Sequence, residues 1–178
     1  MPRIDEGRYA YQFPQGWTAA KYDEDGFYVK KFQKVGLVED GNKGVKAVDV
    51  LAFGDGPELW LIEQKDYSGG GAEIKAGELL YAAAGKLVGT LACLAVAHKN
   101  CQLGSASQQL AAQALRKTRI RCVLHVEQPA KPSRLFPQVI DPKTARDTFR
   151  RAVGPIDSHA EFGNQEQLNA KNWAWVIV

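Results

Sequence analysis

The sequence predicts an α/β (α+β) fold with a central mixed sheet of four to six strands flanked by helices. Two nearly continuous apolar runs, VKAVDVLAF (45–53) and LWLIEQKDY (59–67), have the composition of strands that are covered on both faces. A long helical segment follows them, and strands then alternate with helices. The length of 178 residues is typical of one domain with its own core.

The N-terminal part is expected to contribute a strand hairpin. Residues 17–34 are rich in Tyr, Phe, Val and Trp, which favour strands, and Asp25-Gly26 is a pair typical of tight turns. A helix is the alternative for this segment. We therefore predict a single domain over residues 1–178, in which residues 1–44 are a candidate N-terminal hairpin extension.

Helices and strands alternate in the rest of the chain. SGGGAE (68–73) ends the second apolar run, because clustered glycines favour a break. Ser105 (or Ser107) and Asp141 are expected to cap the two later helices. The predicted elements are a helix over 73–98, a helix over 105–117, a strand over 119–128, a helix over 141–154 and a last strand within 172–178.

Charge is distributed unevenly along the chain. The net charge is +3, but residues 1–98 hold 11 basic and 14 acidic side chains, whereas residues 99–178 hold 12 and 6. A basic second half can attract a polyanion such as nucleic acid, and a solvated surface explains it equally well. The basic residues in question are Arg116, Lys117, Arg119, Arg121, Arg146, Arg150 and Arg151.

The cysteines and the N-terminus indicate a cytoplasmic protein. Cys93, Cys101 and Cys122 are odd in number and lack CxxC spacing, so neither a disulfide framework nor a zinc cluster is predicted. The polar start MPRIDEGRY does not resemble a signal peptide. The apolar run 79–97 carries Lys86 near its middle, which disfavours a membrane span, and we expect a buried helix there.

Three charged residues are predicted to meet on one face of the paired apolar runs. If the turn between the runs is centred on Gly56, Asp49 lies directly opposite Glu63. Lys65 lies two residues beyond Glu63, and side chains at i and i+2 of a strand point to the same face. Asp49, Glu63 and Lys65 are therefore expected to cluster at one end of the hairpin.

Such a cluster suits a divalent metal ion. Carboxylates directly opposite each other on paired strands have Cβ atoms about 4.5–5.5 Å apart and would repel each other. Mg²⁺ (or Mn²⁺) prefers oxygen ligands and often takes one or two carboxylates, and the backbone carbonyl of Gln64 would be a further ligand. Lys65 would orient or help deprotonate a water that attacks a phosphodiester.

The segments VD (48–49) and IEQK (62–65) resemble the PD-(D/E)XK, or restriction-endonuclease-like, nuclease superfamily, and AVDVLAF…LWLIEQKDY looks like a mostly uncharacterised bacterial branch of it. The superfamily places its Asp on the second core strand and its acidic-x-Lys on the third, followed by a helix and a strand, which is the order here. The resemblance implies a restriction-endonuclease-like fold. It also implies Mg²⁺-dependent hydrolysis of DNA (RNA is the less favoured alternative), with a homodimer or a partner protein as candidate assemblies and no membrane. Asp49, Glu63 and Lys65 would then be catalytic, and Asp49, Glu63 and Gln64 would hold the metal.

The chain departs from this pattern in two respects. Val48 stands where the superfamily pattern has Pro. Members usually have a helix before the core hairpin, often with an extra acidic residue, and no clear amphipathic helix precedes residue 45. Asp23, Glu24 and Glu39 are the alternatives for that acid, although a turn or loop residue on a solvated surface is the favoured interpretation of each.

Two other interpretations of the charged cluster remain open. One is a structural ion-pair cluster. The other is a nuclease fold without activity, which serves as a nucleic-acid- or protein-binding subunit of a larger complex. His98, His125 and His159 share no metal-ligand spacing and are not expected in the site, Asp66 points to the opposite face of its strand, and Tyr67 shares the face of Lys65.

Overall fold

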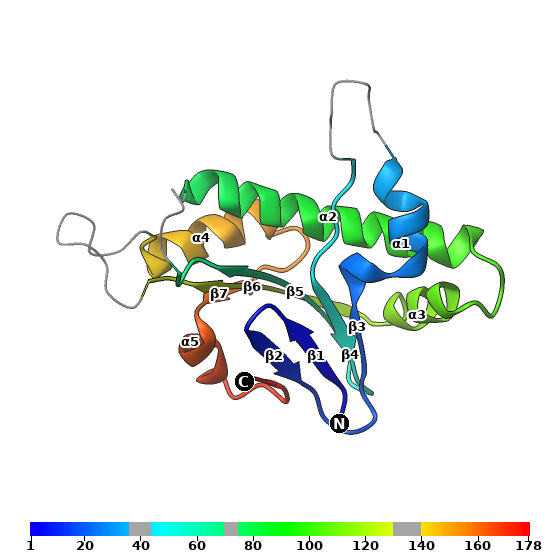
Figure 1. Ribbon diagram of the computed structural model, residues 1–178, viewed down its shortest axis with the longest axis horizontal. Helices are drawn as coiled ribbons and strands as arrows, with labels where there is room; N and C mark the ends of the chain where they lie inside the picture. The colour runs from blue at the N-terminus through cyan, green and yellow to red at the C-terminus, as the bar shows by residue number, and fades with distance from the viewer. Residues whose placement is uncertain (36–43, 70–74, 130–139) are drawn as a thin grey trace.

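A computed structural model describes residues 1–35, 44–69, 75–129 and 140–178, and it contains two β-sheets with helices around them (Figure 1). The larger sheet has five strands in the order β3-β4-β5-β6-β7. Their bounds are Thr18–Lys21 (β3), Val50–Phe53 (β4), Glu58–Asp66 (β5), Arg119–Glu127 (β6) and Glu161–Gly163 (β7). β3, β4 and β5 are antiparallel neighbours, whereas β5, β6 and β7 run parallel, so the sheet is mixed, as predicted.

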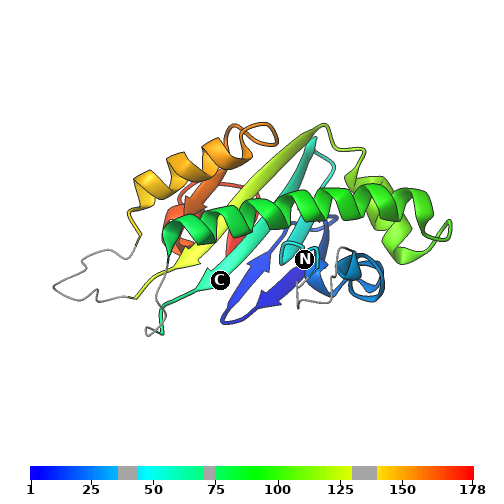
Figure 2. The same cartoon turned by 90° about the horizontal axis from the view of Figure 1, so that it is seen from above.

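Four helices lie on one side of the larger sheet (Figure 1). Their bounds are Gly26–Lys30 (α1), Ala76–Asn100 (α2), Ala106–Ala114 (α3) and Pro142–Val153 (α4), and short 3-10 turns at Tyr22–Glu24 and Phe32–Lys34 flank α1. Figure 2 shows α2 lying across the strands. The prediction of a mixed α/β architecture with flanking helices is confirmed.

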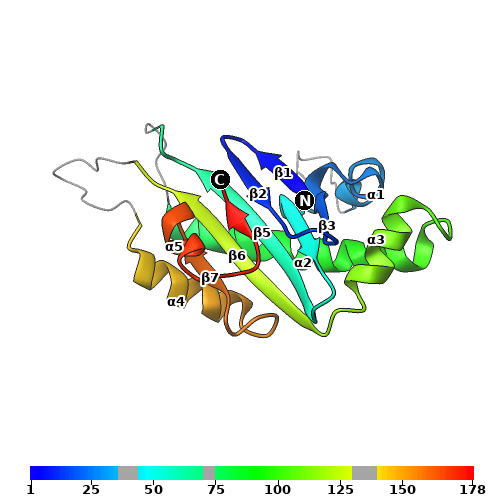
Figure 3. The ribbon, with the colours of Figure 1, turned by 90° about the horizontal axis from the view of Figure 1, so that it is seen from below.

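A smaller antiparallel sheet lies on the other side of the larger one, together with α5 (Gln165–Asn169) (Figure 3). Its strands are β1 (Arg3–Glu6), β2 (Tyr9–Gln12) and β8 (Val176–Ile177), in the order β1-β2-β8. Ala10 and Val178 exchange two backbone hydrogen bonds of 2.8 Å, which join the first strand pair to the end of the chain. The first and last segments of the sequence therefore depend on each other for their pairing.

The β4–β5 hairpin has the register that the sequence predicts. Val50 pairs with Ile62, and Phe53 pairs with Leu59, so each pair of residue numbers is symmetric about Gly56. Leu51 and Leu61 face the helices, while the intervening residues face the smaller sheet. This alternation is set by the period of two in a strand, and it fixes which face carries Glu63.

Apolar side chains form a core on each face of the larger sheet. On the helix side, Leu61 and Leu124 belong to one cluster with Leu87 and Leu94 of α2. On the other side, an aromatic cluster joins the two sheets. It contains Tyr11, Phe13, Trp60, Trp173 and Trp175. Burial on both faces explains why the strand sequences are apolar almost throughout.

Helix α2 approaches the segment before β4 closely. A Cβ atom at Gly89 would lie 2.2 Å from the carbonyl oxygen of Lys46, so a larger residue would push the two backbones apart. The neighbouring Thr90 Oγ1 accepts a hydrogen bond from Val48 N at 2.9 Å. These contacts position the backbone that leads into Asp49.

By length and composition alone, α2 is apolar enough to span a membrane, and 44% of its most apolar window is buried within the protein. The helix packs on the larger sheet, as predicted for residues 79–97, and Lys86 lies on its sheet-facing side. The burial of one face therefore accounts for much of the apolar composition.

The predicted hairpin over 17–34 is wrong in its second half. β3 covers Thr18–Lys21, but α1 stands where the second strand was expected. Asp25 caps this helix, because its Oδ1 accepts hydrogen bonds from Phe27 N (2.9 Å) and Tyr28 N (3.1 Å). An Asp side chain that is well suited to a turn is equally well suited to a helix N-cap, and here the cap prevails.

The remaining predicted elements agree in type with the structure and differ at their ends. Ser105 and Asp141 cap α3 and α4 as expected. The last strand is restricted to Val176–Ile177 instead of extending through the 172–178 segment. The predicted break SGGGAE lies partly outside the described residues. Strands β1, β2 and β7 and helix α5 were not predicted.

Candidate functional site

Asp49 lies immediately before β4 and is held by the adjacent strand. Its side chain is 7% exposed, and its Oδ2 accepts a hydrogen bond from Gln64 N at 2.7 Å. Continuation of the β4–β5 register places Glu63 opposite Asp49, as the sequence predicts. The geometric part of the prediction is thus satisfied for the two carboxylates.

Glu63 is the more deeply buried of the two acids, with a side chain that is 1% exposed. Its Oε1 lies 2.5 Å from Lys65 Nζ and 2.7 Å from Lys86 Nζ. Its Oε2 is buried and accepts no hydrogen bond from the residues that the structure describes. A buried carboxylate oxygen without a donor is costly, so this position suits a bound cation or a water.

Lys65 completes the predicted group of three. Its side chain is 35% exposed, and its Nζ donates a hydrogen bond to Gln64 O at 3.0 Å as well as contacting Glu63. The backbone carbonyl of Gln64 therefore faces the same cluster. Asp49, Glu63, Lys65 and this carbonyl are brought together as the sequence predicts.

The structure adds Lys86 of α2, which was not predicted to lie in the site. Lys86 Nζ lies 3.1 Å from Asp49 Oδ1 and 2.7 Å from Glu63 Oε1, so one ammonium group bridges the two carboxylates. The signal was present in the sequence as a single lysine within a long apolar stretch. A lysine buried in that setting needs an acidic partner.

Burial and mutual charge determine the protonation of the cluster. Burial and the neighbouring negative charge of Asp49 raise the pKa of Glu63 to about 7, against the opposite influence of Lys65 and Lys86. Burial lowers the pKa of Lys86, but the charges of Glu63 and Asp49 outweigh burial and hold this pKa above its ordinary value. Two acidic side chains face two ammonium groups, and the charge of Glu63 changes near neutral pH.

A pocket of about 410 Å³ opens onto the cluster. Its polar lining residues are Asp23, Tyr28, Gln33, Lys46, Glu63, Lys65 and Lys86. Asp23, one of the alternatives for an extra acid, thus lies at the site, and its pKa is raised by burial and by the charge of Asp49. Glu24 points elsewhere and pairs with Lys21 at 2.9 Å, and Glu39 lies outside the described residues.

The donor set fits a hard divalent cation that keeps part of its water shell. Among the described residues, no three His, Cys, Asp or Glu side chains are grouped closely enough to hold a metal ion. Mg²⁺, however, commonly uses only one or two carboxylates together with waters. Asp49, Glu63 and the Gln64 carbonyl supply such a set, and Glu63 Oε2 is an oxygen in need of a partner. Lys86 would have to leave the carboxylates for both of them to bind one cation.

The histidines and Asp66 lie apart from the carboxylates, whereas Tyr67 lies near enough to Glu63 that burial, together with that negative charge, raises the pKa of Tyr67. His125 is buried, and it hydrogen bonds with Tyr11 Oη (2.7 Å) and Glu127 Oε1 (2.9 Å). Asp66 pairs with Arg8 at 2.8 Å on the opposite face of β5, as expected for a structural residue. Tyr67 and His98 are half-buried outside the pocket lining, and His159 lines a different pocket.

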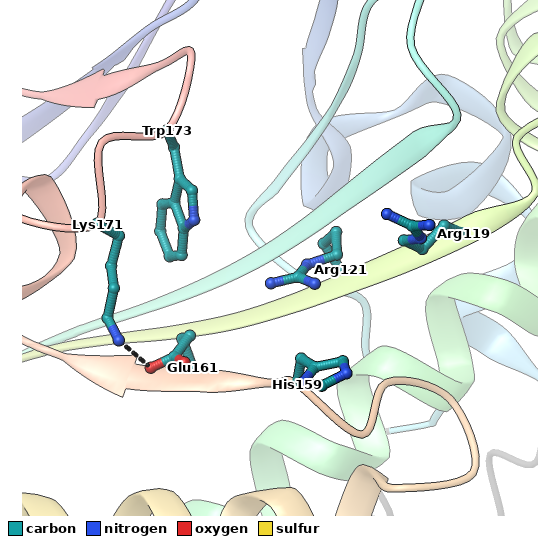
Figure 4. Close-up of a pocket in the computed structure, with 6 residues that line it drawn as sticks. All are labelled: Arg119, Arg121, His159, Glu161, Lys171 and Trp173. Atoms are coloured by element: carbon teal, nitrogen blue, oxygen red, sulfur yellow. Dashed lines mark ion pairs between the residues drawn. The ribbon is translucent and has the colours of Figure 1, made fainter.

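The described basic residues of the second half also lie away from the carboxylate pocket. Arg119 and Arg121 of β6 line another pocket, shown in Figure 4. Lys117 donates a hydrogen bond to Gly56 O at 3.0 Å, next to the β4–β5 turn. Arg150 of α4 binds Glu161 and donates a hydrogen bond to Ala160 O at 2.8 Å, which is a structural role.

Comparison with known proteins gives one partial likeness. The chain is 32% identical, over 209 aligned residues, to a cysteine–tRNA ligase of Neisseria meningitidis. The alignment covers 98% of this chain but only 30% of that protein, so the chain spans less than a third of the length of the curated relative it matches. No protein-family profile matches the chain, and no solved structure matches it.

Proposed function

We propose that this chain is a metal-dependent nuclease with a restriction-endonuclease-like fold, which hydrolyses phosphodiester bonds of DNA, with RNA as the less favoured alternative substrate. The observation that carries the proposal is the opposition of Asp49 and Glu63 on one face of the sheet, with Lys65 beside them. The order of an antiparallel hairpin, helix α2 and a parallel strand β6 agrees with the superfamily that the sequence resembles.

Each residue of the cluster has a distinct task in this proposal. The carboxylates of Asp49 and Glu63 and the carbonyl of Gln64 would hold Mg²⁺ or Mn²⁺. When bound, such an ion lowers the pKa of the attacking water and polarises the phosphoryl group. Lys65, which reaches the pocket, would orient the water and stabilise the negative charge that develops on the phosphate.

The position of Lys86 favours a second candidate function. An ammonium group that already neutralises both carboxylates is what a structural ion-pair cluster requires. The chain would then be a nuclease-fold subunit without catalysis, which binds nucleic acid or protein. This alternative predicts that divalent cations do not bind at the cluster.

The two candidates are separated by a cleavage assay. Purified protein is incubated with plasmid DNA, single-stranded DNA and RNA, in EDTA, Mg²⁺ or Mn²⁺. Because the matched relative is named for tRNA, tRNA belongs in the RNA arm. We expect cleavage only with the metal ions, and loss of at least a hundredfold in rate for Lys65→Met and Asp49→Asn.

A matched control and a metal-binding measurement complete the assay. Lys99→Met changes an exposed lysine at the end of α2 and should retain full activity. Cleavage that persists in Asp49→Asn would contradict the proposal. Absence of both cleavage and Mn²⁺ binding in calorimetry would favour the subunit without catalysis.

A further inference from the structure

A second pocket, of about 560 Å³, lies on the face of the larger sheet opposite to Asp49 and Glu63. It is lined by Arg119, Arg121, His159, Glu161, Lys171 and Trp173 (Figure 4). These residues come from β6, from β7 and the loop before it, and from the segment after α5. Segments far apart in the sequence therefore build one concave site.

Arg121 is the central cation of this pocket. Figure 4 shows its guanidinium directed into the open space between Trp173 and Glu161. The side chain is 18% exposed, and its buried Nε has no hydrogen-bond partner among the described residues. The nearest acid, Asp157, lies 3.9 Å away, and the same carboxylate oxygen already accepts a hydrogen bond from Cys122 N at 2.8 Å. The guanidinium thus keeps donors for a ligand.

The charged residues that line the pocket give it a net positive charge. Glu161 is neutralised twice, because Arg150 contacts Oε1 and Lys171 Nζ lies 3.1 Å from Oε2. Arg119 is 63% exposed and lies 3.6 Å from Glu58, a distance too long for a strong hydrogen bond. An anionic group near Arg119 and Arg121 would therefore meet two guanidinium groups, which are well matched to phosphate.

The pocket also offers an aromatic wall. The Trp173 ring projects into the pocket (Figure 4), and it packs against Trp175 and Trp60, whose ring centroids lie 4.8 and 5.0 Å away. A ring supported in this way is a rigid platform for a planar ligand. A volume of about 560 Å³ is far larger than a lone phosphate requires and falls in the usual range for small-molecule sites.

We propose that this pocket binds a nucleoside phosphate, with the base against Trp173 and the phosphate at Arg121 and Arg119. The ligand is either a free nucleotide or the phosphorylated end of a strand, since the recognised chemistry is the same. This inference goes beyond the proposed nuclease activity and does not depend on it, because the pocket shares no residue with the carboxylate site.

The test is a calorimetric titration of the full chain in EDTA, which removes divalent metals from the carboxylate site. The probes are adenosine 5′-monophosphate, adenosine, ribose 5-phosphate, and DNA and RNA tetranucleotides with a 5′-phosphate. We expect saturable binding of the monophosphate or of the tetranucleotides, and at least tenfold weaker binding of the two fragments. The preferred probe identifies the source of the ligand.

Variants assign the binding to the pocket. Arg121→Gln should weaken the preferred probe at least tenfold, and Trp173→Leu at least fivefold, while Trp173→Phe should retain most of the affinity. Arg3→Gln, which changes an exposed arginine of β1, is the matched control and should bind normally. Absence of binding by every probe, or equal affinity in Arg121→Gln and wild type, would overturn the inference. Circular dichroism and thermal unfolding establish that each variant is folded.

Discussion

Lys86 Nζ lies 2.7 Å from Glu63 Oε1, so a helix supplies the cation that neutralises a buried carboxylate of the sheet. The same ammonium group also contacts Asp49, and both acids thereby depend on one side chain of α2. A divalent ion that used both carboxylates would compete with this lysine. Competition of this kind can be measured directly.

Replacement of Lys86 by Met should therefore have opposite effects on stability and on metal affinity. In EDTA, the loss of a buried ion-pair partner should lower the free energy of unfolding by about 3 kcal/mol. With the competitor removed, Mn²⁺ should bind roughly tenfold more tightly and restore most of the lost stability. Urea unfolding with and without Mn²⁺ measures both quantities, and Lys99→Met is the control. If Mn²⁺ does not stabilise Lys86→Met, the carboxylates are not a metal site.

The pH dependence of stability should carry a contribution from Glu63. Its pKa in the folded protein, about 7, lies above the ordinary value of 4.5, so the folded state holds this proton more tightly than the unfolded state does. The corresponding stability is fully present below pH 4.5 and is lost as pH rises through 7. The loss is on the order of 3 kcal/mol for a shift of this size.

Glu63→Gln tests this assignment because the amide does not titrate. Relative to wild type, the variant should gain stability progressively from pH 5 to pH 8, measured by urea unfolding in EDTA. An identical pH profile for the two proteins would show that Glu63 keeps an ordinary pKa. Asp5→Asn changes an exposed acid of β1 and should leave the profile unaltered.

Two glycines of α2 should respond in opposite ways to the same substitution. A Cβ at Gly89 would collide with Lys46 O, whereas a Cβ at Gly85 would meet nothing within 4 Å. Gly89→Ala should lower the unfolding temperature and displace the backbone before Asp49. Gly85→Ala should raise stability by roughly 0.5–1 kcal/mol, because alanine is the better helix former. Thermal unfolding of the pair checks the close approach, and a neutral Gly89→Ala would contradict it.

Asp25 should contribute more to stability than its partly exposed position suggests. It caps α1 through Phe27 N and Tyr28 N, and its Oδ2 lies 3.0 Å from Ser107 Oγ of α3. Asp25→Ala should cost about 1–2 kcal/mol of unfolding free energy, as measured in urea. Ser107→Ala, which removes only the link to α3, should cost less. Equal effects of the two substitutions would mean that the cap contributes little.

The hairpin was predictable because its two strands and its turn are contiguous in the sequence. A single assumption, symmetry about Gly56, gives the pairing of Leu51 with Leu61 and the common face of Glu63 and Lys65. Because successive side chains of a strand alternate between its two faces, this register fixes the face on which each later residue lies. Local information was therefore sufficient for this part of the site.

Lys86 could not be placed in the same way. Its distance from Asp49 depends on where α2 crosses the sheet, and this is decided by contacts such as Gly89 with Lys46. Asp25 illustrates a different difficulty, since the residue type suits both a hairpin turn and a helix cap. The choice between them depends on packing that a local segment does not encode.

The short strands of the smaller sheet were also beyond local reasoning. β1 reads RIDE and has a single apolar residue, and β2 finds its second neighbour only at the last residues of the chain. Such pairings bring together segments that are far apart in sequence, and their stability comes from the aromatic cluster beneath them. The alternation of apolar and polar residues along the chain therefore does not predict these strands.

The hydrogen bonds between Ala10 and Val178 have a consequence for how this unit can be combined with other polypeptide. Polypeptide attached after Val178 would leave the fold beside the strand that contains Ala10. Removal of only Val176–Val178 would take away the second neighbour of β2 and should therefore loosen the first strand pair as well.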